Sequence, residues 1–213
     1  MKKEEIEILN PFFSIWLSTR ETIRYVLDYK DLRYSLTIAA VASIPNTIGV
    51  IGEWEKSYDI PFWLMLIGIF VLGPIFGLIG LVIGAAIYTL VGKWFGGTGK
   101  FKEMLQAGGV NMIPIIWMTP YYIVAAIIAR NGFADITIWP VPAGVIGWLL
   151  LSFFIMSAFS IWMVIIQSKA IGEVHQFSSW RGFSTLIIPA ITIGIIVFII
   201  TFIVIFSVST GEY

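Results

Sequence analysis

Charged residues divide the chain into five long stretches that contain no Asp, Glu, Lys, Arg or His. The stretches are 19, 33, 26, 33 and 30 residues long, and about 20 apolar residues in a helix cross the hydrocarbon core of a bilayer. In chain order they are Tyr34–Gly52, Ile60–Gly92, Met104–Ala129, Ile136–Ser168 and Gly182–Gly211. We therefore predict an all-α integral membrane protein, built as a bundle of five transmembrane helices.

The second stretch, Ile60–Gly92, is longer than a bilayer needs, because 33 residues in one helix would extend about 50 Å. It must tilt, protrude or break near Gly73-Pro74, and a break there would give six spans as the alternative. Its glycines at spacings of four, three and four share one helical face and predict a packing seam, within the chain or between chains. The other reading is that glycine is simply common in membrane helices. The seam residues are Gly73, Gly77, Gly80 and Gly84.

The segment before the first stretch has an amphipathic pattern. Aromatic residues cluster around Trp16, and the following helix separates apolar Ile23 and Val26 from basic Arg20 and Arg24. This pattern is typical of a helix lying in the membrane interface, although an amphipathic helix docked on protein would read the same way. We predict a segment over residues 1–33 with an interfacial helix, followed by a five-span domain over residues 34–213.

Lysine and arginine are distributed very unevenly between the two sides of the predicted bundle. With five spans, eleven of the thirteen fall on the side of the N-terminus and two on the other side. Because basic residues mark the cytoplasmic side of a membrane protein, we expect a cytoplasmic N-terminus and a C-terminus outside. The first seven residues contain no apolar stretch after their lysines, so we expect no cleaved signal peptide.

Composition restricts the partners and the chemistry. The chain is 58% apolar and 12% charged, against about 25% charged residues in soluble domains, so its main contact is the lipid bilayer. Its formal net charge is zero, so we expect no nucleic-acid partner. The absence of cysteine excludes disulfides, thiol nucleophiles and thiolate metal sites.

Ionisable residues are missing from the interior of every predicted span, which argues against ion-coupled transport. Mild polar residues remain inside the spans, and they either line a pathway or form hydrogen bonds between helices. These candidate intramembrane contacts are Asn46, Asn111, Ser157, Ser160 and Gln167.

His175 is the only histidine and lies in the turn after the fourth stretch. One histidine without cysteines or clustered carboxylates does not make a zinc site, and no Gly-x-Ser-x-Gly motif suggests a hydrolase. We expect His175 to lie on the surface, with a proton-sensitive contact to Glu173 as the alternative. We therefore predict no catalytic residue, no cofactor and no metal.

Four segments carry a resemblance to a known family. They are Asn10-Pro-Phe-Phe-Ser-Ile-Trp16 with Thr19-Arg-Glu-Thr-Ile-Arg24; Gly77-Leu-Ile-Gly-Leu-Val-Ile-Gly84; Phe95-Gly-Gly-Thr-Gly-Lys-Phe-Lys102 with Gly108-Gly-Val-Asn-Met-Ile-Pro114; and Gly172-Glu-Val-His-Gln-Phe-Ser-Ser-Trp-Arg181. With these segments the chain resembles the Yip family of membrane proteins, named for interacting with Ypt/Rab GTPases, and in particular its prokaryotic branch. The resemblance implies five spans, a cytoplasmic N-terminus, a prokaryotic cell membrane and no enzymatic activity.

The chain departs from the eukaryotic members of that family at two places. It has Asp31-Leu-Arg-Tyr-Ser35 where they carry Asp-Leu-x-Gly-Pro, and Gly108-Gly109 where they place Gly-Tyr. These departures argue against a GTPase partner. For prokaryotic members the resemblance implies assistance to another membrane complex, such as an export system of the ABC type.

We therefore predict a non-enzymatic scaffold, or an accessory or regulatory subunit, that binds another membrane protein or itself through its cytoplasmic face. The alternative is a transporter or channel-like conduit for an uncharged or lipophilic small molecule. The candidate partner face consists of Trp16, Arg20, Arg24, Lys93, Trp94, Lys100, Lys102, Glu173, His175, Trp180 and Arg181.

Overall fold

The computed structural model describes residues 9–58, 61–130 and 141–210, and within these ranges the chain is helical with no strand. The N-terminal helices are α1 (Pro11–Ser14), α2 (Thr19–Tyr29) and α3 (Leu32–Tyr58). The second apolar stretch forms α4 (Phe62–Ile67), a π-helical turn η1 (Gly68–Leu72) and α5 (Gly73–Trp94). The rest forms α6 (Phe101–Val110), α7 (Ile113–Trp117), α8 (Thr119–Arg130), α9 (Ala143–Val174) and α10 (Ser179–Thr210).

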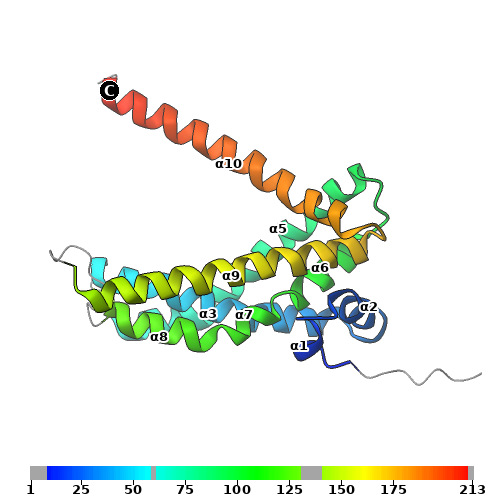
Figure 1. The fold of residues 1–213 in the computed structure, drawn as a ribbon, viewed down its shortest axis with the longest axis horizontal. Coiled ribbons are helices and arrows are strands. Elements are labelled where there is room, and N and C mark those ends of the chain that lie inside the picture. Colours follow the sequence, from blue (N-terminus) through cyan, green and yellow to red (C-terminus); the bar gives the residue numbers. More distant parts are fainter. Residues whose placement is uncertain (1–8, 59–60, 131–140, 211–213) are drawn as a thin grey trace, which may run out of the picture.

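The long helices lie side by side except for the last one. Helix α3 contacts α5, α6, α7 and α8, while α9 contacts α2, α6 and α10. Helix α10 starts beside the end of α9 and then diverges from it, so that the two form a V (Figure 1). The molecule is therefore a bundle from which one apolar helix leaves at an angle.

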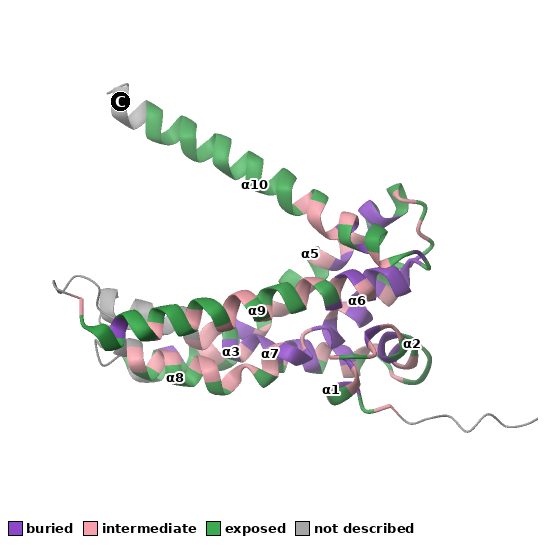
Figure 2. Cartoon of the chain, viewed as in Figure 1, coloured by how far each residue is buried: buried purple, intermediate pink, exposed green. Residues whose placement is uncertain are grey.

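Buried residues gather at one end of the bundle (Figure 2). We call this the packed end; it is formed by α1, α2, α6, the last turns of α5 and α9, and the first turns of α10. Its core joins residues from both sides of the predicted domain boundary at residues 33 and 34, which itself stays a prediction. The core residues are Ile15, Ile23, Val26, Ile38, Ala85, Met104, Leu105, Ala107, Val110, Ile113, Ile166, Ala170, Ile171, Val174 and Phe177.

Outside the packed end, the helices expose apolar side chains. Every side chain of α10 from residue 191 to residue 206 is exposed, and most of them are Ile, Val or Phe. A helix that is apolar all round and not covered by protein is stable in lipid, where its backbone hydrogen bonds are satisfied internally. The protein is therefore an integral membrane protein.

Within the part of the chain that the structure describes, three continuous helices are long and apolar enough to cross a membrane: Trp63–Trp94, Ala143–Val174 and Ser179–Phe206. A fourth candidate is the pair Phe101–Trp117 and Thr119–Ile128, which is bent by 51°. The first predicted span falls in α3, whose side chains are described only to residue 48. The all-α membrane fold is confirmed with three or four candidate spans, and five spans stay a prediction.

The second stretch does not break at Gly73-Pro74, so the basis for a six-span count is wrong. Proline has no N–H to bond the carbonyl four residues earlier, and the helix adapts by widening one turn. The Gly73 N–H donates to the Gly68 carbonyl, five residues back, and α5 then continues from Pro74. One long helix results, with a π-helical turn before the proline.

The third stretch is bent, unlike the simple span that the sequence predicted. The bend lies at Met118, between two prolines at positions 114 and 120. Pro120 cannot donate to the carbonyl of Ile116, and the Thr119 hydroxyl donates to that carbonyl instead, at 2.6 Å. A local side chain thus satisfies the carbonyl that proline leaves free.

The N-terminal helix α2 packs on protein. Thr19, Thr22, Ile23 and Val26 are buried, and α2 contacts α6 and α9. This is the docked arrangement that the sequence left open as the alternative. A position of this segment in the membrane interface stays a prediction.

The predicted glycine seam divides into two parts. A methyl group on Gly73 would meet Thr47, and one on Gly77 would meet Ser43, so both glycines lie directly against α3. Gly80 faces nothing within 4 Å, and Gly84 faces only Tyr88 of its own helix. Two crossing helices are close only around their crossing point. The prediction of a packing seam within the chain is therefore wrong for Gly80 and Gly84. A contact of these two glycines between chains stays a prediction.

Candidate functional site

The predicted partner-face residues all lie at the packed end, but the structure separates them into two groups. One group forms a polar cluster around two buried side chains, Glu173 and His175, with Arg20 half-buried and Arg24 exposed at its edge. The other group, which we call the outer face, is exposed: Lys93, Trp94, Lys100, Lys102, Trp180 and Arg181. Trp16 is half-buried beside the core.

Glu173 is the centre of the ionic part of the polar cluster. Its side chain is 3% exposed and contacts two arginines of α2, Arg20 Nη1 at 3.3 Å and Arg24 Nη2 at 2.8 Å. Arg20 and Arg24 are four residues apart and therefore share one face of α2. Arg20 Nη2 also donates to the Phe177 carbonyl at 2.7 Å and to Ser179 Oγ at 3.2 Å. These bonds fix α2 to the turn between α9 and α10.

His175 is buried, so the prediction of a surface histidine is wrong. Its exposed fraction is 1%, and its ring stacks on Phe177 with centroids 5.3 Å apart. The Gly99 N–H donates to Nδ1 at 3.2 Å, and Nε2 lies 3.1 Å from the Tyr88 carbonyl oxygen. Because a carbonyl only accepts, the ring is the neutral tautomer with its proton on Nε2. Both ring nitrogens are thus used, and neither is left for a substrate or a metal.

Glycines make the space for this ring. A methyl group on Gly92 or on Gly97 would collide with the imidazole, and one on Gly99 would meet Val174 and the ring. The Thr98 N–H also donates to the His175 carbonyl at 3.3 Å. The glycine-rich turn between α5 and α6 therefore packs closely against the His175 ring and encloses it. The glycines at positions 92, 97 and 99, read together with a lone histidine, were the sequence signal for this contact.

The surroundings of His175 keep it neutral. Burial is the largest influence and lowers its pKa below the ordinary value, and nearby Lys93 lowers it further. The hydrogen bond to Tyr88 and the charge of Glu103 act in the opposite direction, but the net pKa shift is downward. The contact with Glu173 that the sequence left open does not occur, because Glu173 is paired with the arginines of α2.

The outer face carries large side chains on fixed turns. Trp94 is 77% exposed at the end of α5, and Trp180 is 79% exposed at the start of α10. Exposed lysines and an arginine surround them in the sequence. Tryptophan and arginine are enriched at protein–protein contacts and at membrane interfaces.

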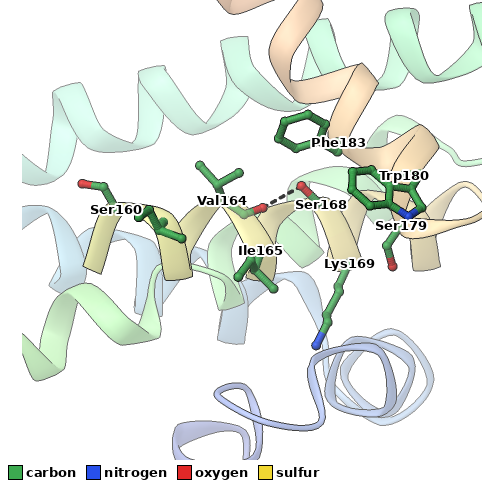
Figure 3. Close-up of a pocket in the computed structure, with 9 residues that line it drawn as sticks. Ser160, Val164, Ile165, Ser168, Lys169, Ser179, Trp180 and Phe183 are labelled. Carbon is green, nitrogen blue, oxygen red and sulfur yellow. Dashed lines mark hydrogen bonds between the residues drawn. The ribbon is translucent and has the colours of Figure 1, made fainter. Parts of the chain in front are cut away.

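The candidate intramembrane contacts have different environments. Asn111 is buried, and its Nδ2 donates to Gln167 Oε1 of α9 at 2.9 Å. Ser160 lines a cavity of about 580 Å³ between α9 and α10 (Figure 3). Ser157 is half-buried, and Asn46 is exposed.

A further polar contact was not predicted from the sequence. Gln106 of α6 is buried, and its Nε2 donates to the carbonyls of Val26 and Lys30 at 2.9 and 2.7 Å. It thereby bonds two carbonyls at the end of α2: that of Lys30, and that of Val26, which also accepts from the Lys30 N–H at 3.0 Å. A glutamine in an otherwise apolar stretch was the only sequence signal for it.

The residues with described positions include no group of three or more His, Cys, Asp or Glu that could hold a metal ion. Comparison with family models identifies a match to the Yip1 domain over residues 13–201. The chain belongs to the Yip1 domain family. The match covers most of the chain and extends from α1 to α10, so both turns that enclose the polar cluster lie within the Yip1 domain. No curated protein and no solved structure matches the chain.

Proposed function

We propose that this Yip1-domain protein is a non-enzymatic membrane scaffold, or an accessory or regulatory subunit of another membrane complex. The observation that carries the proposal is the pairing of a rigid polar cluster with an exposed outer face. Glu173 and His175 tie α2 and two turns together, and Trp94 and Trp180 project from those same turns. Tryptophan has only two rotatable side-chain angles and loses little side-chain entropy on binding, which favours its use as an anchor.

The proposal places the outer face in the cytoplasm of a prokaryotic cell, together with the N-terminus. The asymmetry of Lys and Arg along the sequence supports this orientation. With five spans the C-terminus lies outside. The partner is a membrane protein or a second copy of the chain, and neither a GTPase nor nucleic acid is part of the proposal.

The test is crosslinking in native membranes with an amine-reactive reagent, followed by mass spectrometry of what co-purifies. We expect a recurrent partner joined through Lys93, Lys100 or Lys102. Replacing Trp94 or Trp180 with Ala should weaken that crosslink while the protein remains folded. Trp63→Ala is the matched control, because Trp63 is also exposed but lies in α4, away from the outer face. Self-crosslinks alone would overturn the accessory-subunit proposal.

A conduit for an uncharged or lipophilic molecule is the second candidate. The cavity between α9 and α10, which includes Ser160, is the observation in its favour. Flux of such a molecule into liposomes containing the purified protein, reduced by Ser160→Leu, would support it. Gln167 gives it less support, because that side chain already accepts a hydrogen bond from Asn111.

A further inference from the structure

The walls of the cavity between α9 and α10 are mainly apolar, although Ser160, Ser168 and Ser179 also line it. Ile161, Val164 and Ile165 of α9 and Phe183 of α10 supply apolar side chains (Figure 3). The Ser168 hydroxyl donates to the Val164 carbonyl at 2.6 Å, so it is already satisfied within α9. The walls therefore suit a hydrocarbon and not a polar solute.

The rim of the cavity has a different composition. Lys169 and Trp180 lie at the packed end of the groove (Figure 3). Lys169 forms no ion pair with any residue that the structure describes. The stem of Lys169 borders the groove, and its ammonium group lies on the side of α9 away from Phe183 and Trp180 (Figure 3), from where a change of rotamer brings it to the mouth of the groove. Lysine with a buried stem and an accessible charge, next to tryptophan, is typical of the level of lipid headgroups.

The length of the groove matches half a bilayer. Lys169 and Ser160 are nine residues apart on α9, which corresponds to about 14 Å along the helix. One leaflet of hydrocarbon is about 15 Å deep, half of the about 30 Å core. With Lys169 at the headgroup level, Ser160 lies close to the middle of the membrane. The groove thus has the direction and depth of one lipid tail.

The groove has room for a hydrocarbon chain. Its volume is about 580 Å³ over a length of about 14 Å, which accommodates one extended acyl chain along α9.

We propose that the groove binds one acyl chain of an anionic phospholipid, with the phosphate held by Lys169 and the glycerol level marked by Trp180. The positive charge at the rim is unpaired and the walls are mainly apolar, so the charge of the headgroup decides which lipid is preferred. The proposal requires only that the packed end lies at a membrane surface, and it does not depend on the proposed protein partner.

The experiment uses the full chain in nanodiscs of phosphatidylcholine that contain a small fraction of a photoactivatable lipid. The probe has a diazirine near the middle of one acyl chain and carries either a phosphatidylglycerol or a phosphatidylcholine headgroup. After irradiation, mass spectrometry maps the labelled residues. We expect the phosphatidylglycerol probe to label Val164, Ile165 or Phe183 in preference to residues on the exposed part of α10, such as Ile195, which report bulk lipid.

Two variants make the test specific. Lys169→Gln should reduce the groove preference for phosphatidylglycerol over phosphatidylcholine by about fivefold, the weight of one basic residue at an anionic surface. Lys102→Gln is the matched control, because Lys102 is exposed at the packed end and does not line the groove, and it should leave the preference unchanged. Val164→Trp should fill the groove and abolish its labelling while labelling at Ile195 persists.

Three results would overturn the proposal. Equal labelling of the groove by both probes, unaffected by Lys169→Gln, would mean ordinary contact with bulk lipid. A crosslink between groove residues of two chains, with no lipid label, would mean that a second copy covers the site. Labelling that Lys102→Gln reduces as much as Lys169→Gln does would mean a general charge effect. Because Lys169→Gln changes only an unpaired side chain, it tests the site even if Val164→Trp does not fold.

Discussion

The Nε2 atom of His175 lies 3.1 Å from the main-chain oxygen of Tyr88, a residue 87 positions earlier in the chain. This hydrogen bond joins the last turns of α5 to the turn between α9 and α10. On the opposite side of the ring, Nδ1 accepts from the Gly99 N–H at 3.2 Å. Only the neutral imidazole makes both bonds, because a protonated ring has no acceptor.

The stability of the protein should therefore depend on pH through His175. Burial lowers its pKa in the folded state, so below about pH 6.5 the unfolded chain binds a proton that the folded chain does not. Stability is complete above about pH 6.5 and falls as the pH decreases toward the lowered pKa. We expect the unfolding midpoint in detergent to decrease between about pH 7 and about pH 5.

The control for this prediction is His175→Gln, which has no titrating group at that position. The chain contains no other histidine, so the variant should show a flatter pH profile, although its stability at neutral pH is lower. If the variant loses stability with falling pH as steeply as the unchanged protein, His175 is not the group responsible.

The contact between α3 and α5 gives a prediction for the glycine seam. Gly77 lies against Ser43, whose hydroxyl is held by the Ala39 carbonyl at 2.7 Å and is not free to move away. Gly77→Ala should therefore destabilise the protein by about 1–3 kcal/mol through overpacking. The free energy of unfolding in mixed detergent micelles is the measurement.

Gly80 provides the comparison on the same helix. Nothing lies within 4 Å of the position that its Cβ would take, so Gly80→Ala should be neutral or stabilise by up to about 1 kcal/mol. Adding Ser43→Gly to Gly77→Ala should recover stability, because the small residue then lies on the other helix. Equal stability of the two single alanine variants would show that the α3–α5 contact is not as close as described.

The sequence predicted those features that depend on composition and on the length of apolar stretches. Long charge-free stretches identified α9 and α10, because apolar length alone distinguishes a membrane span. They left open whether the second stretch continues through Pro74. The family resemblance is confirmed by the match over residues 13–201. The distribution of Lys and Arg also predicted that Arg20, Lys93 and Arg181 lie on one side of the bundle, and in the structure all three lie at the packed end.

The sequence did not predict what depends on contacts between distant segments. His175 is buried only because three glycines, at positions 92, 97 and 99, make room for it from another turn. The spacing of the seam glycines could not show where α3 crosses α5, so Gly80 and Gly84 looked the same as Gly77. The bend at Met118 depends on whether Thr119 replaces the bond that Pro120 cannot make, which composition does not reveal.

The ion pairs of Glu173 predict which of three sets of substitutions lowers the free energy of unfolding most. Arg20 is 36% exposed and Arg24 is 65% exposed, whereas Glu173 is 3% exposed. The double change of Arg20→Met and Arg24→Met leaves a buried carboxylate without a partner and should cost about 3–5 kcal/mol. Glu173→Gln leaves arginines that reach water and should cost about 1–3 kcal/mol. Arg24→Met alone should cost less than about 1 kcal/mol.

Release of α2 from the bundle can be followed with a thiol-specific reagent. Because the chain contains no cysteine, a single introduced cysteine is the only site that the reagent labels. Thr22→Cys places a thiol at a buried position of α2, and Glu21→Cys places one at an exposed position of the same helix. Maleimide should label the first slowly and the second quickly. In the Arg20→Met, Arg24→Met background the first should approach the rate of the second. An unchanged rate would mean that apolar packing alone holds α2.

The pair formed by Asn111 and Gln167 decides between a structural and a pathway role for these polar residues. Asn111 Nδ2 donates to Gln167 Oε1 at 2.9 Å, and no residue that the structure describes bonds the buried Asn111 Oδ1. Gln167→Leu leaves the whole amide without a partner and should cost about 1–2 kcal/mol. Replacing both residues with Leu should cost less than the sum of the single changes. We expect a coupling energy of about 0.6 kcal/mol, with about 1.7 kcal/mol as the upper end for such pairs in membranes. Additive single effects, accompanied by loss of solute flux into liposomes, would contradict the structural role and assign the two amides to a pathway.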